Sequence, residues 1–373
     1  MQGRFVATIV TVLIDDQNMA RSHGSRLLPA IFPTMPGISA GHFTVGNNGA
    51  VAERPSFVLG RMSPASVDLI PARGDAFVQS DGRPTATFRE ALRRIPNTRN
   101  AVSVISLYAQ TLGVIAAAIW ISHPVAWIVA FVLMGRAHAQ FLSLMHEAAH
   151  RLLFSNKSVN DFVGAWLLGY PSFTSTAAYR RVHMAHHREE FGPDEPDIPL
   201  YANYPVPRAS LRRKLTRDAT GRTGFALLRQ QLRGLRSPDP RVRRTLVRIL
   251  AVQAALFIAG VAVGVPWLYP VMWLAPYLTV WRVINRLRSI AEHGGMRAGS
   301  DRRVSTHSVR QHRLARFFLV PYNIGFHLAH HVDAGIPFRS LPAYQRHLRD
   351  SGFAGPRIEY PSYLALWKAL RAG

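Results

Sequence analysis

The chain of 373 residues carries 45 Lys and Arg against 21 Asp and Glu, a formal net charge of +24, and 48% of its residues are hydrophobic. It contains no Cys, which excludes disulfides, thiolate zinc sites, iron–sulfur clusters and a catalytic thiol, so any bound metal must rely on His and carboxylate ligands. A net positive charge of this size indicates either nucleic acid or an anionic membrane surface as a partner. Because the apolar residues are grouped in runs of near-spanning length, the membrane is favoured and nucleic acid is not expected as a partner.

The N-terminal part of the chain differs in composition from the rest. Residues 1–95 are rich in Gly, Pro, Ser and Thr and show no sustained hydrophobic period, which predicts a poorly structured extension. The apolar run over residues 5–14 is too short to span a bilayer, and Asp15 and Asp16 follow it without a small-residue cleavage site. These features disfavour a signal peptide. Met62 is an alternative translation start.

Four apolar segments follow, each close to the roughly 20 residues that a membrane-spanning helix needs. They cover residues 101–122, 125–145, 249–265 and 267–284. The connections inside the two pairs, at residues 123–124 and 264–266, lack Lys and Arg, whereas the segments between and after the pairs are dense in Arg. By the positive-inside rule, both pairs enter the membrane from the cytoplasmic face and return to it.

This pattern predicts an all-α integral membrane protein of the inner, cytoplasmic membrane, with four transmembrane helices arranged as two hairpins and a cytoplasmic helical cap. Residues 96–352 form the expected main domain, and residues 353–373 a C-terminal tail. The moderately apolar residues 162–178 are predicted to be interfacial or re-entrant. Arg136 and His138 lie inside the second span, so they are expected to face the bundle interior in structural polar contacts.

Three histidine clusters of five residues each hold eight of the sixteen His of the chain. They read His-Glu-Ala-Ala-His at residues 146–150, His-Met-Ala-His-His at 183–187 and His-Leu-Ala-His-His at 327–331. On a helix, positions i, i+3 and i+4 share one face. Each cluster therefore presents its imidazoles together, and neutral imidazole binds iron, zinc or copper. Because eight imidazoles exceed what one metal ion accepts, the clusters predict two metal ions.

The predicted topology places all three clusters at the cytoplasmic face. The candidate metal ligands are His146, His150, His183, His186, His187, His327, His330 and His331. His293 follows the fourth apolar segment and is a ninth candidate ligand. Acidic residues near the clusters whose carboxylates could accept the second N–H of an imidazole are Glu147, Glu189, Glu190, Asp194, Glu195, Asp197 and Glu292. Asn323 could orient a ligand or a bound water. An ordinary acidic turn after the second cluster is the alternative, and His307, in an Arg-rich stretch, is expected to be solvated.

Two other interpretations of the clusters are weaker. The first cluster matches the HExxH pattern of zinc proteases, but that interpretation leaves the other two clusters unexplained. A non-enzymatic membrane metal transporter would need polar ligands through the depth of the membrane, whereas the predicted ligands gather at one face.

On these residues the chain resembles the membrane fatty acid desaturase superfamily over about residues 100–350. The three clusters carry the resemblance, together with the acidic-Pro-acidic stretch that follows the second cluster and with residues 323–326 before the third. The resemblance implies a non-haem di-iron centre held by the eight cluster histidines and by His293. It further implies that O2 and electrons from an external donor are used to remove two hydrogens from an unactivated C–C bond.

The resemblance also bears on the electron donor and the substrate. The three-residue gap in the first cluster resembles acyl-lipid desaturases, and no fused cytochrome b5 segment is visible, which implies a separate donor such as ferredoxin. The family pattern HHxFPxxP is replaced after His331 by Val332-Asp333-Ala334. This departure favours an acyl-like or small hydrophobic substrate, including an amino-acid-derived secondary metabolite such as dihydrorhizobitoxine. A hydroxylase, a ketolase or an alkene-forming decarboxylase on the same scaffold is the alternative.

Overall fold

The computed structural model describes residues 57–192, 195 and 197–372, and this part of the chain is predominantly helical. Its regular elements, in chain order, are η2 (Ser66–Asp68), α2 (Ala86–Leu92), α3 (Asn97–Ile121), α4 (Pro124–Ala149), α5 (Lys157–Phe162), η3 (Val163–Gly169), η4 (Tyr170–Ser172), α6 (Thr176–Arg188), α7 (Ile198–Tyr201), α8 (Arg208–Ala219), α9 (Arg222–Leu232), η5 (Arg233–Arg236), α10 (Pro240–Ala262), η6 (Tyr269–Leu274), α11 (Ala275–Leu278), α12 (Val280–His293), β1 (Ser308–Val309), α13 (Arg313–Phe318), α14 (His327–Val332), α15 (Leu341–Asp350), β2 (Glu359–Tyr360) and α16 (Tyr363–Leu370). The two short strands pair in parallel. The prediction that the chain is mainly helical is confirmed.

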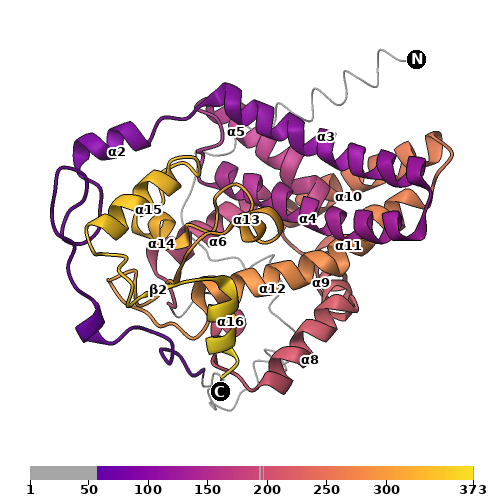
Figure 1. Ribbon diagram of the computed structural model, residues 1–373. Coiled ribbons are helices and arrows are strands. Elements are labelled where there is room, and N and C mark those ends of the chain that lie inside the picture. The colour runs from indigo at the N-terminus through magenta and orange to yellow at the C-terminus, as the bar shows by residue number, and fades with distance from the viewer. Residues whose placement is uncertain (1–56, 193–194, 196, 373) are drawn as a thin grey trace.

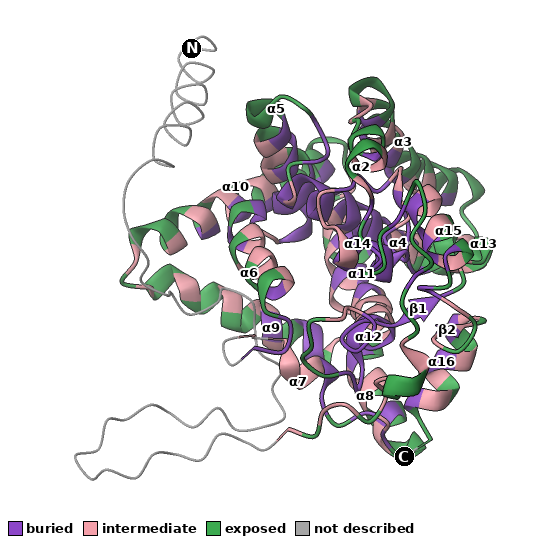
Figure 2. Cartoon of the chain, turned by 90° about the vertical axis from the view of Figure 1, so that its left-hand side faces the viewer, coloured by how far each residue is buried: buried purple, intermediate pink, exposed green. Residues whose placement is uncertain are grey.

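Three helices of the described chain, α3, α4 and α10, are long and apolar enough to cross a membrane. They project together to one side of the molecule (Figure 1), and much of the surface of α3 and α10 is exposed (Figure 2). Large apolar side chains of the three helices are exposed, for example Trp120 of α3, which is 86% exposed, Ile128 of α4 and Ile258 of α10. A continuous exposed apolar surface of this kind fits lipid rather than water. The chain is therefore a membrane protein.

The fourth apolar segment, predicted over residues 267–284, is not one continuous α-helix. It is divided into the π-helical η6, the four-residue α11 and the start of α12. Pro270 and Pro276 lack the backbone N–H that a regular helix requires, and Thr279 leaves helical geometry with φ −119° and ψ −85°. The segment still packs against α10 and α4. The four-span arrangement stays a prediction.

The two polar residues of α4 behave differently. His138 is fully buried, and its Nδ1 and Nε2 lie 3.2 Å from Ser172 Oγ and 3.1 Å from the Trp273 carbonyl oxygen. The predicted interior structural contact is confirmed for this residue. Arg136 instead donates from Nε to the carbonyl oxygen of Phe317 at 2.6 Å, so it ties α4 to α13.

The ends of the described chain pack on the core. Of the predicted N-terminal extension, residues 1–56 lie outside the described residues, but residues 57–95 contain η2 and α2. They are held by backbone hydrogen bonds such as Met62 N–H to the Gly295 carbonyl at 2.9 Å, so this stretch is more structured than its composition predicts. In the C-terminal tail, β2 pairs with β1 and α16 packs on α12. The domain boundaries at residues 95 and 352 stay predictions.

Candidate metal centre

Three helices bring the histidine clusters to one place. His146 lies in the last turn of α4, and His150 caps the end of that helix. α6 begins after Ser175, whose Oγ accepts a hydrogen bond from the Ala178 N–H at 3.3 Å, and its last two turns carry the second cluster. The third cluster forms most of the short helix α14. The fold therefore assembles the site from segments that are far apart in the sequence.

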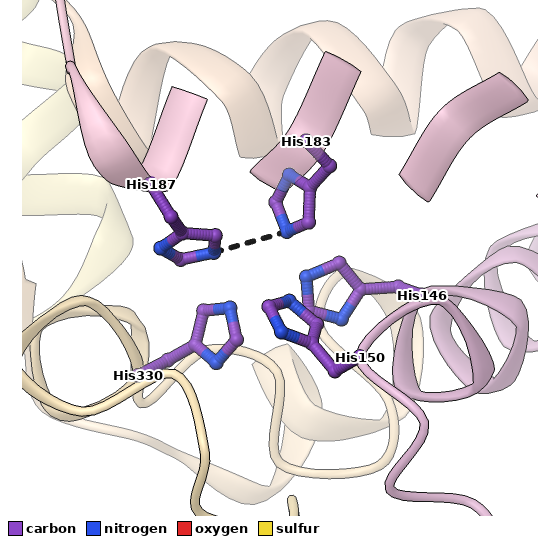
Figure 3. A group of neighbouring side chains, drawn as sticks. All are labelled: His146, His150, His183, His187 and His330. Carbon is purple, nitrogen blue, oxygen red and sulfur yellow. Dashed lines mark hydrogen bonds between the residues drawn. The ribbon is translucent and has the colours of Figure 1, made fainter. Parts of the chain in front are cut away.

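The imidazoles form two adjoining groups. Within each group, one ligand nitrogen of every residue lies within 4.8 Å of the others. The larger group consists of His146, His150, His183, His187 and His330, whose rings surround a common space (Figure 3). The smaller group consists of His186, His293 and His331. His327 adjoins it, with its Nε2 2.9 Å from Nε2 of His293. All nine candidate ligands, His293 included, are therefore brought together.

Several of these nitrogens are shielded from solvent and have no hydrogen-bond partner among the described residues. They are Nε2 of His146, His150, His330 and His331, and Nδ1 of His327. A shielded polar atom without a partner is costly in a folded protein. The four Nε2 atoms among them fit bound metal that accepts their lone pairs, and the absence of thiolate leaves a donor set of nitrogen and oxygen.

The protonation state of the imidazoles also suits metal binding. Burial, followed by neighbouring imidazoles, places the pKa values of His183, His187, His330 and His331 well below the ordinary histidine value. An imidazole must be neutral to bind a metal. These four side chains are therefore in the metal-binding form at neutral pH.

Two carboxylates hold the imidazoles from outside. Nδ1 of His331 donates to Glu190, whose Oε1 also lies 2.8 Å from the Arg302 guanidinium. Nδ1 of His186 lies 2.6 Å from Glu195 Oε1. Burial lowers the pKa of His186, but the hydrogen bond and charge of Glu195 outweigh it and raise that pKa. A carboxylate on Nδ1 fixes the ring and leaves Nε2 free to face the metal.

The remaining side of the smaller group is held by a backbone carbonyl and an ion pair. His293 Nδ1 lies 2.8 Å from the Ser305 carbonyl oxygen, which leaves its Nε2 directed at the group. Glu292 Oε1 lies 3.6 Å from His327 Nδ1 and accepts a hydrogen bond from Arg288 Nε at 2.6 Å. Glu292 is thus a third predicted carboxylate that lies beside a candidate ligand.

Three further predicted polar neighbours do not contact the imidazoles. Glu147 Oε1 accepts the Phe338 N–H at 3.1 Å, so it fixes the chain beyond the third cluster. Asn323 accepts from Arg316 at 2.8 Å and donates to the Phe338 carbonyl at 3.2 Å. Asp197 lies at the wall of an adjoining cavity, where burial and then a neighbouring carboxylate raise its pKa to about 6.

Sequence reasoning included Glu190 and Glu195 among the candidate carboxylates, but nothing in their spacing distinguished them from the acids beside them. The Ser305 carbonyl carries no sequence signal at all. The prediction that His307 is solvated is wrong: it is buried, its Nε2 lies 2.9 Å from the Gly294 carbonyl oxygen, and burial lowers its pKa to about 4.

A cavity of about 210 Å³ adjoins the two groups. His183, His186, His293 and His327 line one part of its wall. Apolar side chains from α4, α9, α10 and α12, and from the chain before α6, line much of the rest: Leu142, Met145, Phe173, Leu227, Ile249 and Trp281. A mostly apolar space that ends at a cluster of candidate metal ligands has the form of a substrate site.

These features define a helical membrane protein with a histidine-rich candidate metal site. Residues 120–363 match the model of the fatty acid desaturase family, and the chain belongs to that family, as its histidine clusters predict. It is similar to the dihydrorhizobitoxine desaturase of Bradyrhizobium elkanii, with 28% identity over 281 residues that cover 70% of this chain and 78% of that protein. The chain is accordingly an oxidoreductase of the desaturase type.

Proposed function

We propose that this protein is an O2-dependent membrane desaturase that introduces a carbon–carbon double bond with a non-haem di-iron centre. The observation that carries the proposal is the meeting of nine imidazoles from four separate elements, with five of their shielded nitrogens lacking any partner in the described chain. Membership of the desaturase family supports the same assignment.

The donor set fits two ions better than one. The larger group would hold one iron, and the smaller group with His327 would hold the other. When bound, the two irons supply O2 activation and the removal of two hydrogens from the substrate. Nitrogen ligands suit iron, and the carboxylates on His186 and His331 would raise the basicity of those imidazoles.

The chain's own residues position the substrate and exclude water. The cavity would place a C–C bond beside His183, His293 and His327, with an apolar wall that keeps bulk water out. The histidines act as ligands and not as acid–base catalysts, because their nitrogens are committed to metal or to carboxylates. Protons would travel through water or through carboxylates such as Asp197 and Glu292.

We further propose that residues 96–352 form a domain with four spans in the inner membrane and an active site on the cytoplasmic side. α4 ends at the first histidine cluster, and α10 begins with the basic residues Arg241, Arg243 and Arg244. Basic residues at a span end favour the cytoplasmic side. This arrangement would put the histidine centre where soluble electron donors are found.

The proposed partners follow from this placement. A separate donor such as ferredoxin would supply electrons, and nucleic acid is not a partner. The substrate would be acyl or acyl-like, in keeping with the family. The name of the similar Bradyrhizobium elkanii protein supports a more specific candidate, an amino-acid-derived metabolite such as dihydrorhizobitoxine.

Product analysis tests the reaction type. Membranes that contain the protein would be supplied with ¹⁸O2, a reduced ferredoxin system and the metabolite that accumulates in a deletion strain. A desaturase yields a product two hydrogens lighter than its substrate, without ¹⁸O. A chain with His330→Ala provides the inactive control.

Other outcomes would redirect the assignment. Incorporation of ¹⁸O into the product would indicate a hydroxylase or ketolase on the same scaffold, and loss of CO2 would indicate an alkene-forming decarboxylase. Metal flux into liposomes without O2 consumption would indicate a transporter and contradict the enzymatic assignment.

A further inference from the structure

One arginine in the wall of the cavity has no acidic partner among the residues that the structure describes. Arg282 lies near the start of α12, and the same helix carries Asn285, Ser289 and His293 to the cavity wall. These positions recur at helical spacing and so share one face. From Arg282 to His293 the helix rises by about 16 Å. The cavity therefore has a cation toward one end and the candidate metal ligands at the other.

The other charged groups of the cavity wall are occupied. Arg288 donates to Glu292 at 2.6 Å, and Asp197 accepts a hydrogen bond from Tyr201. For Arg282, by contrast, no carboxylate of the described chain lies within ion-pair distance. Its Nε is shielded from solvent and has no hydrogen-bond partner in that same part of the chain.

An aromatic ring fixes the position of this cation without neutralising it. The Arg282 guanidinium carbon lies 4.3 Å from the ring centroid of Tyr277. A cation–π contact is weaker than a paired and hydrogen-bonded charge, and the shielded Nε of Arg282 lacks a partner in the described chain until an acceptor joins it. The planar guanidinium presents parallel N–H groups that match the oxygens of a carboxylate or a phosphate.

We infer that Arg282 binds an anionic oxygen group of the substrate, a carboxylate or a phosphate, and thereby sets which bond of the chain lies beside the histidine centre. The inference rests on the proposed function and narrows its substrate class. Substrates with a free acid or phosphate group are selected over neutral esters. Arg282 is a specificity-determining residue and is placed away from the candidate metal ligands.

Binding measurements with three probes of equal chain length test the inference. Laurate, methyl laurate and dodecyl phosphate would be titrated into the purified, iron-loaded full chain in a neutral detergent. The wild-type protein is expected to bind at least one anionic probe about tenfold or more tightly than the ester. Tighter binding of laurate assigns a carboxylate, and tighter binding of dodecyl phosphate assigns a phosphate.

Three variants separate a specific contact from general charge attraction. Arg282→Gln is expected to remove the preference for the anion, whereas Arg282→Lys retains part of it because the charge remains. Arg229→Gln removes an exposed arginine from the neighbouring helix α9 and should leave the preference unchanged. The iron content of each variant, measured separately, reports whether the protein is folded and loaded.

The results also distinguish this inference from the proposed function. Equal binding of the three probes, no binding of any of them, or a preference that persists in Arg282→Gln would overturn the role of Arg282. A protein that takes up no iron when iron is supplied, but still prefers the anion, would contradict the di-iron proposal and leave the anion site standing.

Discussion

Glu190 accepts a hydrogen bond from Nδ1 of His331, although 141 residues separate the two in the chain. The contact joins the segment after the second histidine cluster to the third cluster, and the Arg302 guanidinium lies 2.8 Å from the same carboxylate oxygen. Because an anionic partner on Nδ1 orients the ring and raises its basicity, Glu190→Gln is expected to weaken iron binding about 10- to 100-fold. Competition with a calibrated iron chelator measures this change.

Glu189→Gln is the matched control for that variant. Glu189 is the preceding residue, but its side chain is exposed and makes no hydrogen bond to an imidazole among the described residues. It should retain wild-type iron affinity. Equal losses of affinity in the two variants would show that the charge of the segment matters and that the specific contact does not.

Removal of single histidines should separate metal binding from membrane insertion. His330→Ala and His186→Ala each take one ligand from a different group. Both variants should reach the membrane, because the apolar helices are unchanged, but hold much less iron and show no activity. His312→Ala is the control, since this exposed residue lies outside both groups, with its Nε2 2.9 Å from the Pro361 carbonyl oxygen. Full activity of His330→Ala would contradict its role as a ligand.

His307 predicts a pH dependence of stability. Burial lowers its pKa to about 4 in the folded chain, whereas the unfolded chain keeps an ordinary value of about 6.5. Because the unfolded state binds the proton first as the pH falls, the folded state loses stability between about pH 6.5 and pH 4, by on the order of 3 kcal/mol from this one group.

Thermal unfolding of the wild type and of His307→Gln across this pH range tests the effect. Gln cannot take up the proton, so the variant should lose less stability than the wild type as the pH is lowered. Identical pH dependence in the two proteins would show that His307 is not neutral and buried in the folded chain.

A buried ion pair fastens α8 to α12. Arg286 and Asp218 are both almost fully shielded, and Nη2 of Arg286 donates to Asp218 Oδ1 at 3.1 Å. Asp218→Asn leaves the guanidinium charge without its counter-ion and should destabilise the protein by about 3–5 kcal/mol. The double variant Asp218→Leu with Arg286→Met removes both charges and should recover most of that loss. Thermal unfolding in detergent compares them, and a harmless Asp218→Asn would contradict the assignment.

The fold was predictable where one physical requirement dominates the sequence. Continuous apolar length was enough to locate α3, α4 and α10. The fourth segment is also rich in apolar residues, but Pro270 and Pro276 divide its helix, and an apolar pattern does not reveal a missing backbone donor. Residues 57–95 were misjudged for another reason: their order comes from contacts with distant parts of the chain, such as Met62 with Gly295.

The candidate site was predictable where helical spacing applies. The i, i+3 and i+4 pattern selected the cluster histidines, and the end of an apolar segment pointed to His293. Helical spacing could not show which acidic residue holds which ring, because Glu190 and His331 are brought together only by the fold of the chain. Glu147 and Asn323 lie close to the clusters in sequence, but their side chains instead bind the segment around Phe338.

The most direct test of the di-iron account is anomalous diffraction at the iron edge from crystals of the purified full chain. The account predicts two iron peaks, one among the imidazoles drawn in Figure 3 and the other beside His186, His293 and His331. A single peak, or a pair of zinc ions in place of iron in protein that is fully active, would contradict it.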